Sequence, residues 1–403
     1  MTAKTLPPMR SAARNGKPTA IPAALEVASS PQVKITQLTD ELCSAFIGRD
    51  ELAKLTMTAV VAQKSMLVVS PPGAAKSMLL ETLIRQIKGA TKFVWLMGKF
   101  TEPDEIFGPI DLASLERGER KRNTARKLPE AHFAFLDEYW KASTAIGNAL
   151  LRIINERKFD DGSGEVDVPL RCLFMASNEF APDGETAALF DRAVLRFTVD
   201  YLPSPKDRNK LLWSLNSLPQ PTTTLTLAEC DQAHAEANAL PITEEAKEAA
   251  AKIVEELITV EKIRPSDRRL GLVAPLIRAA AYVAGAKQVE PEHLEILSHM
   301  LWTDPEGQPR KVAAVVARIA NPVGLRVNEL LQQIEDVLAK APPGNRSEAD
   351  RSNLANAMAK VEQHANEMKR MKSSKLVEKA VQHAREVYSI LSRRNLNAPN
   401  KGD

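Results

Sequence analysis

A short loop joins a run of apolar residues to a helical pattern near residue 70 of this 403-residue chain. The apolar run, Met66–Val69, predicts a buried β-strand, and the loop after it has the sequence Ser-Pro-Pro-Gly-Ala-Ala-Lys-Ser. A strand, a tight loop, Lys-Ser and a helix in this order suit phosphate binding, because N–H groups of the loop and of the helix N-terminus point at phosphate oxygens. The loop therefore predicts an α/β fold with a phosphate-binding site.

The predicted loop covers residues 70–78. Its members are Ser70, Pro71, Pro72, Gly73, Ala74, Ala75, Lys76, Ser77 and Met78. We expect Lys76 to neutralise phosphate charge and the hydroxyl of Ser77 to bind Mg²⁺. Ser70 and Ala75 stand where glycine is usual, and a side chain fits there if the local backbone keeps a negative φ. An ordinary turn between a strand and a helix is the alternative interpretation.

Two later apolar runs end in side chains that can act on a nucleotide. The first leads to Asp137 and Glu138, and the second, at residues 173–176, leads to Asn178. We expect Asp137 to join the Mg²⁺ shell and Glu138 to polarise an attacking water molecule. The amide of Asn178 can hold that water or the γ-phosphate. Alternatively, the acids end a strand because loops are solvated, and Asn178 lies in an ordinary turn.

Short apolar runs alternate with helical patterns up to about residue 201, which predicts a parallel sheet with crossover helices. Beyond that point the pattern is helical, and the N-terminal segment is rich in Pro, Ala and Ser. The expected strands are residues 66–69, 94–97, 134–136 and 173–176. The expected parts are a disordered arm (1–32), an α/β nucleotide-binding domain (33–202), an all-helical domain (203–305) and a C-terminal helical extension (306–403).

Two apolar seams within the C-terminal extension predict an antiparallel helical hairpin over residues 345–395. The hairpin either packs onto the preceding helical domain or serves as an arm that docks a partner. Lys369, Arg370, Lys372 and Lys375 lie between its two helices, mixed with acidic residues. This mixture favours a solvated turn over a nucleic-acid patch.

Composition argues against several classes of protein. The chain has 54 basic and 51 acidic residues, so its net charge of +3 gives no general attraction to nucleic acid or to an anionic membrane. Its three cysteines are far apart and lack the short spacings of a zinc site. No apolar run approaches the roughly 20 residues of a membrane-spanning helix. We therefore expect a soluble, cytoplasmic protein.

With these motifs, the chain resembles the AAA+ superfamily of P-loop ATPases and, more closely, the RavA-like branch of the MoxR family. The resemblance spans about residues 38–305. Besides the loop, it rests on residues 101–109, 136–142 and 154–159. That branch also carries alanine before the lysine, so Ser70 is the main departure. The resemblance implies an AAA+ core with a helical lid domain, ATP and Mg²⁺ as ligands, and a homo-hexameric ring.

Further roles follow from the resemblance alone. Ile47 and Gly48 lie in a segment similar to the one that borders the adenine pocket. Residues 107–128 are similar to the insertion in helix 2 that faces the ring pore, and residues 159–168 to the hairpin before the sensor strand. In the family such loops move with the nucleotide state and act on a partner.

The resemblance also implies roles for arginines. Arg192 occupies the place of the arginine that reaches a neighbour's γ-phosphate, with Arg196 as second candidate and a structural pair with Asp191 as the alternative. Arg268 opens a helix similar to the sensor 2 helix, which implies contact with the nucleotide of its own subunit, whereas Arg269 is expected to be a solvated neighbour. An arginine that acts on a neighbouring subunit requires an oligomer.

These features favour an ATP-driven, chaperone-like remodeller of a protein client. By resemblance, a protein with a von Willebrand factor A domain is the first partner to consider. A nucleic-acid translocase is the alternative, but acidic residues in the hairpin region would repel phosphates. They are Asp160, Asp161, Glu165 and Asp167. Because of Ser70 and Ala75, a nucleotide-gated scaffold with little turnover is a third hypothesis.

Overall fold

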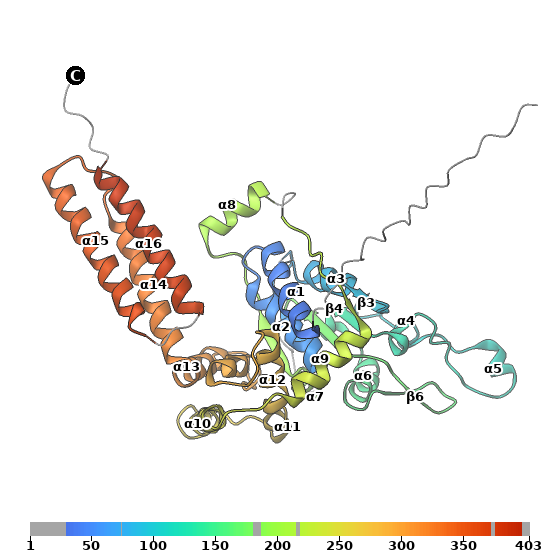
Figure 1. Cartoon of the computed structure of the whole chain (residues 1–403). Helices are drawn as coiled ribbons and strands as arrows, with labels where there is room; N and C mark the ends of the chain where they lie inside the picture. The colour runs from blue at the N-terminus through green and yellow to red at the C-terminus, as the bar shows by residue number, and fades with distance from the viewer. Residues whose placement is uncertain (1–29, 74, 180–186, 215–217, 372–374, 397–403) are drawn as a thin grey trace, which may run out of the picture. The chain divides into compact units, whose positions relative to one another are not determined.

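The computed structural model describes residues 30–73, 75–179, 187–214, 218–371 and 375–396 (Figure 1). Most of the expected N-terminal arm lies outside these ranges, as does Ala74 of the predicted loop. Helix α1 (Pro31–Ala45) begins slightly before residue 33, where we expected the core to start. Among the described helices, none is long and apolar enough to cross a membrane.

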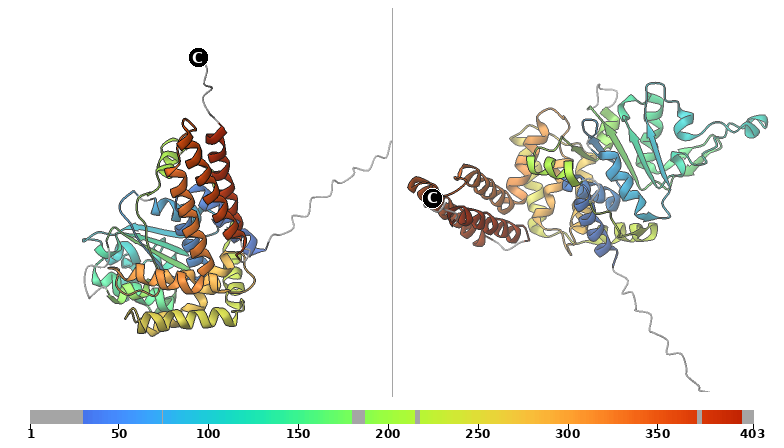
Figure 2. Two further views of the ribbon diagram at one scale, coloured as in Figure 1. Left: turned by 90° about the vertical axis from the view of Figure 1, so that its left-hand side faces the viewer. Right: turned by 90° about the horizontal axis from the view of Figure 1, so that it is seen from above.

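Five parallel strands form the central sheet in the order β3-β4-β7-β1-β8 (Figure 2). The strands are β1 (Met66–Val69), β3 (Lys92–Leu96), β4 (Phe133–Asp137), β7 (Cys172–Ser177) and β8 (Leu195–Thr198). All residues of β1 and β7 are buried, which explains their continuous apolar runs. The four expected strands and the α/β fold class are confirmed, with small shifts at strand ends. Strand β8 was missed because its short run contains Arg196.

Helices connect consecutive strands of the sheet, as parallel pairing requires. They are α3 (Lys76–Arg85), α6 (Thr144–Glu156) and α7 (Ala187–Arg192), together with the 3₁₀ turns η1 (Leu128–Glu130) and η2 (Tyr139–Lys141), while α2 (Asp50–Ala62) precedes the first strand, β1. Helix α6 has an N-cap residue and one apolar face, the two features by which a sequence favours a helix that packs on a sheet. Ser143 caps it by accepting a hydrogen bond from the N–H of Ile146, and its apolar residues Ile146, Leu150 and Ile153 are buried on one face.

The segment similar to the helix 2 insertion contacts the expected hairpin. The elements here are α4 (Pro103–Phe107), α5 (Leu112–Glu116), β5 (Lys158–Asp160) and β6 (Glu165–Asp167). Strands β5 and β6 pair antiparallel, which confirms the hairpin. The N–H of Arg122 donates to the carbonyl of Asp161 at 2.6 Å, and a Cβ added at Gly162 would lie 1.7 Å from the carbonyl oxygen of Arg120. Glycine at 162 therefore permits the backbones to touch.

The helical part that follows shares one apolar core with the α/β part. Its elements are α8 (Pro205–Ser214), β9 (Leu225–Thr226, paired with β2, Ile87–Lys88), α9 (Leu227–Ala239), α10 (Glu244–Thr259), α11 (Asp267–Gly271), α12 (Val273–Val283), η5 (Pro291–His299) and α13 (Gln308–Ala320). Buried residues of α13, including Val312 and Val316, belong to this core. Helix α13 thus packs with the lid helices, although we expected residues from 306 onward to belong to the C-terminal extension.

Three further helices enclose a second, separate core. They are α14 (Pro322–Lys340), α15 (Glu348–Lys369) and α16 (Lys375–Leu396). Helices α15 and α16 form the expected hairpin. However, α14 also packs against it and contributes the buried residues Val327, Leu330 and Ile334. The C-terminal unit is therefore a three-helix unit and not a lone hairpin.

Candidate nucleotide-binding site

The three motifs found in the sequence meet at one edge of the sheet. Strands β1, β4 and β7 are parallel, so the residues that follow them lie at the same carboxyl edge. The Lys76 ammonium nitrogen lies 3.1 Å from the Asn178 Oδ1 atom and 3.6 Å from the Asp137 Oδ1 atom. A cation that is largely buried among oxygen acceptors suits a phosphate-binding site.

The backbone of the loop between β1 and α3 turns sharply before the helix. Ser70 is buried, its N–H donates to the Ser177 carbonyl at 3.0 Å, and its φ is not positive. Gly73 has φ +79° and Ala75 has φ +64°. The expectation of a negative φ therefore holds at Ser70 and is wrong at Ala75. The left-handed turn at Ala75 immediately precedes Lys76, the first residue of α3.

Replacing Ala75 with glycine should stabilise the fold slightly. The left-handed conformation costs an L-residue roughly 1–2 kcal/mol, while glycine costs about 0.5–1 kcal/mol through the entropy of the unfolded chain. We expect a net gain of about 0.5 kcal/mol in the free energy of unfolding, measured by urea titration. Ala251→Gly in the exposed part of α10 is the matched control and should cost about 1 kcal/mol. A loss of stability in Ala75→Gly would contradict the expectation.

The acids after β4 are held by defined contacts. The Glu138 N–H donates to the Asp137 Oδ1 atom at 3.0 Å, and Glu138 has φ +50°. The Asn178 Nδ2 atom donates to the Glu138 Oε1 atom at 2.5 Å, and the Lys141 nitrogen lies 3.5 Å from Oε2. We assigned no role to Lys141 from the sequence, although its position one turn after Glu138 was the available signal.

The oxygen donors at this edge suit Mg²⁺ together with a triphosphate. Mg²⁺ prefers hard oxygen ligands and usually keeps phosphate oxygens and waters in its shell. The Ser77 hydroxyl and the Asp137 carboxylate are such donors, and Ser77 lies in the first turn of α3. The N–H groups around the left-handed turns at Gly73 and Ala75 would face the phosphates. These residues therefore fit Mg²⁺ and ATP.

The segment expected to border the adenine pocket lies beside the chain that leaves β8. Ile47 is buried, and Gly48 has φ +63°. A Cβ added at Gly48 would lie 2.6 Å from the Leu202 side chain. The next residue toward the sheet, Tyr201, donates its hydroxyl to the Pro72 carbonyl of the loop at 3.3 Å. Ile47 and Gly48 thus belong to the surroundings of the loop.

Arg192 lies at the opposite edge of the sheet from the phosphate-binding loop. It comes just before β8, and β8 runs parallel to β1 with Leu195 paired to Met66. The Leu195 N–H donates to the carbonyl of Ser65, the residue before β1. Arg192 is therefore near the start of β1, whereas the loop follows its end. This placement separates Arg192 from the loop of its own subunit.

Arg268 is not brought to its own loop either, contrary to the expectation. Its side chain is exposed and lines a cavity of about 580 Å³ together with Arg192 and Ser65. The reason is the anchoring of α11. Ser266, which caps α11, donates to the Asp191 carboxylate at 3.2 Å, and Asp191 is the residue before Arg192. Arg268 and Arg192 consequently share the amino edge of the sheet.

Two other arginines are structural. Arg196 and Arg269 are each 1% exposed. Arg196 donates to the carbonyls of Phe190, Ala193 and Trp302. It therefore cannot present its guanidinium to a neighbour, and the expectation for the second candidate is wrong.

Arg269 is also buried, although we expected it to be solvated. It contacts the Asp191 carboxylate at 2.8 Å and the carbonyls of Met300 and Trp302 at 2.6 and 2.9 Å. Burial lowers the pKa of Arg269, and the contact with Asp191 acts in the opposite direction. Asp191, which we considered as a partner of Arg192, thus pairs with Arg269 and links α7 to the lid helices.

Comparisons with known proteins agree with this architecture. Residues 33–232 match the family model described as the MoxR domain in the MoxR-vWA-beta-propeller ternary systems, and residues 248–315 match an AAA lid domain. One uncharacterized protein of Methanocaldococcus jannaschii is 35% identical over 278 residues, which cover 67% of this chain and 70% of the relative. A second from the same organism is 34% identical over 288 residues, with coverage of 71% and 76%.

Two more distant matches are consistent with these. Chaperone MoxR1 of Mycobacterium tuberculosis is 25% identical over 186 residues, which cover 44% of this chain and 47% of MoxR1. A crystal structure of a Cytophaga hutchinsonii protein has the same fold at 17% identity, with a TM-score of 0.58, and the match covers 72% of this chain and 95% of that one. The motifs, the lid and these matches together show that the chain belongs to the MoxR family of AAA+ ATPases.

Proposed function

We propose that this protein hydrolyses ATP in a ring of identical subunits and uses the resulting movements to remodel a protein client. One observation carries the proposal. The groups that bind and activate a nucleotide, Lys76, Asp137, Glu138 and Asn178, converge at the carboxyl edge of the sheet. Arg192, the charge expected to complete such a site, lies at the amino edge. A second subunit is therefore needed to bring the two halves together.

Each group has a defined task in the proposed reaction. Bound Mg²⁺ and ATP supply the metal charge and the phosphoryl group. Lys76 exchanges its contact with Asn178 for phosphate oxygens, which frees the Asn178 amide to orient the attacking water. Glu138 accepts a proton from that water. Arg192 and Arg268 of a neighbouring subunit neutralise charge that develops on the γ-phosphoryl group. Each Arg268 therefore acts on the nucleotide of the adjacent subunit and not on the nucleotide of its own subunit.

A heterologous contact of this kind joins two different faces of the subunit, and it closes into a ring when the rotation allows. Six subunits is the number that the resemblance implies. We retain the RavA-like placement within this proposal, supported by Ala75 before Lys76 and by residues 136–142. The name of the relative MoxR1 as a chaperone supports remodelling of a protein.

A protein with a von Willebrand factor A domain is the first partner that we propose. The family model that matches this chain is described by ternary systems of MoxR, vWA and β-propeller. The insertion and the hairpin are suitable parts for transmitting movement to such a partner, because Lys121 pairs with Asp161 at 3.7 Å and the backbones touch at Gly162. Movement of one should therefore displace the other.

The charge of these loops does not favour a nucleic-acid translocase. Residues 107–128 and 158–168 together contain seven basic and seven acidic residues. In addition, acidic residues already neutralise basic residues of these loops, as in the contact of Lys158 with Asp167 at 2.6 Å. A surface without net positive charge gives little counterion release on binding a polyphosphate backbone.

Turnover and assembly measured together test the proposed function. We expect ATP hydrolysis per subunit to rise with protein concentration, in parallel with assembly in ATP observed by mass photometry, because the site is completed by a neighbour. Salt-sensitive DNA or RNA binding at low ionic strength would instead support a translocase. Assembly with negligible turnover would support a nucleotide-gated scaffold. Turnover that stays constant over the range in which the ring dissociates would contradict the proposal.

A further inference from the structure

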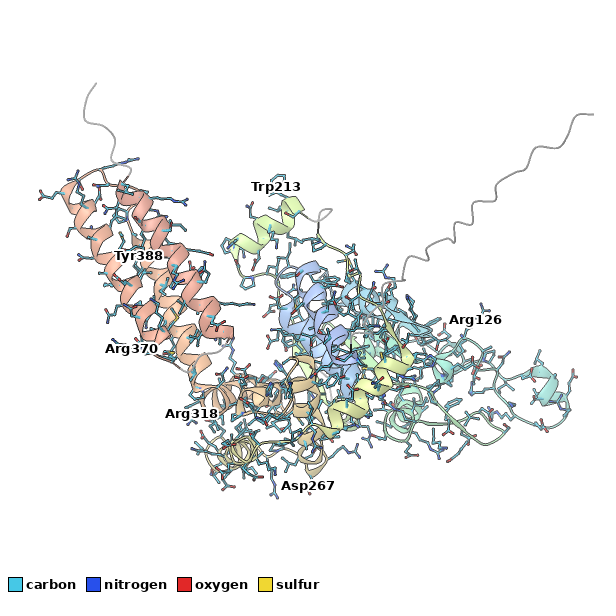
Figure 3. All side chains as sticks on the ribbon, in the orientation of Figure 1. Arg126, Trp213, Asp267, Arg318, Arg370 and Tyr388 are labelled. Atoms are coloured by element: carbon cyan, nitrogen blue, oxygen red, sulfur yellow. The ribbon has the colours of Figure 1, made fainter. Side chains whose placement is uncertain are left out.

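We propose that helix α8 is an intersubunit helix whose apolar end is covered by a second copy of this chain. The inference rests on the ring of the proposed function. Helix α8 (Pro205–Ser214) has no buried residue. Leu211, Leu212 and Trp213 near its end are 40%, 73% and 80% exposed. In Figure 3, Trp213 lies at the end of the helix, away from the neighbouring ribbons.

A helix of this length needs tertiary support. Isolated helices shorter than about 12–15 residues are marginal in water, and most helical stability in proteins comes from packing of an apolar face. Within the described residues, α8 is held mainly at its start, where Arg208 donates to the carbonyls of Leu202 and Pro203, each at 2.8 Å. The Trp213 indole donates to Asn209 of the same helix. Among the residues that the structure describes, none therefore covers the apolar end in a way that would stabilise it.

The position of α8 in the chain points to a second copy as the covering partner. The helix begins beside the candidate nucleotide site, because Asp207 and Leu202 adjoin Gly48 and Tyr201 contacts Pro72. A neighbour that brings Arg192 to the γ-phosphate must lie against this edge. The same edge exposes further apolar surface, since Tyr201 is 63% exposed. The α8 surface is therefore continuous with the interface that the proposed reaction requires.

Charge favours the lid face of the second copy as the surface that meets α8. The helix carries Lys206, Arg208 and Lys210 against one acid, Asp207. The copy that supplies Arg192 also supplies Arg268, which lies on the lid helix α11. Helix α10, which precedes α11 in the chain, is rich in exposed acids. These acids include Glu245, Glu248 and Glu255, while Glu244 pairs with Lys247 of the same helix at 2.7 Å. An apolar residue, Val260, is 65% exposed at the end of the same helix. Basic and apolar groups on α8 thus have acidic and apolar counterparts there.

A double substitution, Leu212→Ser with Trp213→Ser, tests the inference in the full-length protein. We expect the concentration needed for assembly in ATP to rise at least tenfold, because an apolar contact at the interface is lost. Binding of a fluorescent ATP analogue to the dilute subunit should stay the same. The matched control is Tyr388→Ser with Ile390→Ser on α16, where the side chains are 37% and 41% exposed, and assembly should not change.

Tryptophan quenching gives an independent measurement. Trp140 and Trp302 are buried and Trp95 is partly buried, whereas Trp213 is 80% exposed, so acrylamide should quench mainly Trp213 in the dilute subunit. We expect this quenching to fall on assembly of the wild-type protein. If Trp213 is already protected in the monomer, its own chain covers it and the inference is wrong.

Other results separate the inference from the proposed function. One result is that the wild type assembles, Trp213 remains quenchable and the double variant assembles equally well. In that case α8 is not at the interface, whereas the proposed ring itself is not contradicted. If the double variant assembles normally but no longer binds a von Willebrand factor A partner, a different protein covers α8, which also overturns the inference. If the wild type never assembles in ATP, the proposed ring fails together with the inference.

Discussion

Replacing Glu138 with glutamine is expected to lower ATP turnover by roughly 10²–10⁴-fold, the contribution typical of a positioned general base. Glutamine has nearly the same shape and can keep the contact with Asn178, but it cannot accept a proton from water. The affinity for ATP should stay within about twofold, because Lys76, Ser77 and Asp137 are unchanged. Steady-state turnover and equilibrium binding of ATP together check this result.

The matched control for this variant is Glu362→Gln, an exposed glutamate on α15 in the separate C-terminal unit. It should leave turnover and binding unchanged. If Glu138→Gln hydrolyses ATP at the wild-type rate, another group activates the water. If the wild type already shows negligible turnover, the nucleotide-gated scaffold becomes the better hypothesis.

Replacing Arg192 with alanine is expected to lower turnover on the order of 10³-fold without weakening ATP binding to the isolated subunit. Related phosphoryl transfer depends on such an arginine by 10³–10⁵-fold. Arg192 precedes β8 at the amino edge of the sheet, so it cannot serve the loop that follows β1 in its own subunit. In this variant, ATP turnover should therefore fall while the affinity of the isolated subunit for ATP stays unchanged.

Mixing two inactive variants tests whether Arg192 acts on a neighbour. An Arg192→Ala subunit keeps its own Lys76, Glu138 and Asn178, and a Glu138→Gln subunit keeps its Arg192. Mixed rings should therefore recover part of the wild-type turnover at the interfaces where an intact Glu138 meets an intact Arg192. If both variants assemble and no turnover returns, Arg192 does not complete the neighbour's site.

Arg196→Ala is the control for Arg192→Ala because the two residues are close in the chain and differ in burial. Removing the buried Arg196 guanidinium leaves three backbone carbonyls without their donor, and each unsatisfied buried group costs about 1–3 kcal/mol. Thermal unfolding should reveal a loss of about 3 kcal/mol or more. Arg192→Ala should lose less stability than Arg196→Ala because Arg192 is only partly buried, and an equally large loss there would indicate a structural role.

The sheet and the carboxyl-edge site could be predicted from the sequence because their signals are local. Continuous apolar runs mark strands that are buried on both faces, and the residue after each run falls at the carboxyl end of its strand. Parallel pairing then gathers Lys76, Asp137 and Asn178 at one edge without further information. Strand β8 lacked such a signal, since Arg196 interrupts its apolar run.

The sequence by itself therefore determined the α/β core, the loop before Lys76 and the polar residues that act on a nucleotide, since each depends on short-range pattern. Only the tertiary structure decided which of Arg268 and Arg269 is buried. Adjacent helical residues differ by about 100° in direction, and the approach of α11 to Asp191 selects Arg269. The same long-range contact holds Arg268 near Arg192, on the edge away from its own loop. Contacts between residues distant in the chain, such as Asp191 and Ser266, leave no local pattern from which this placement could be inferred.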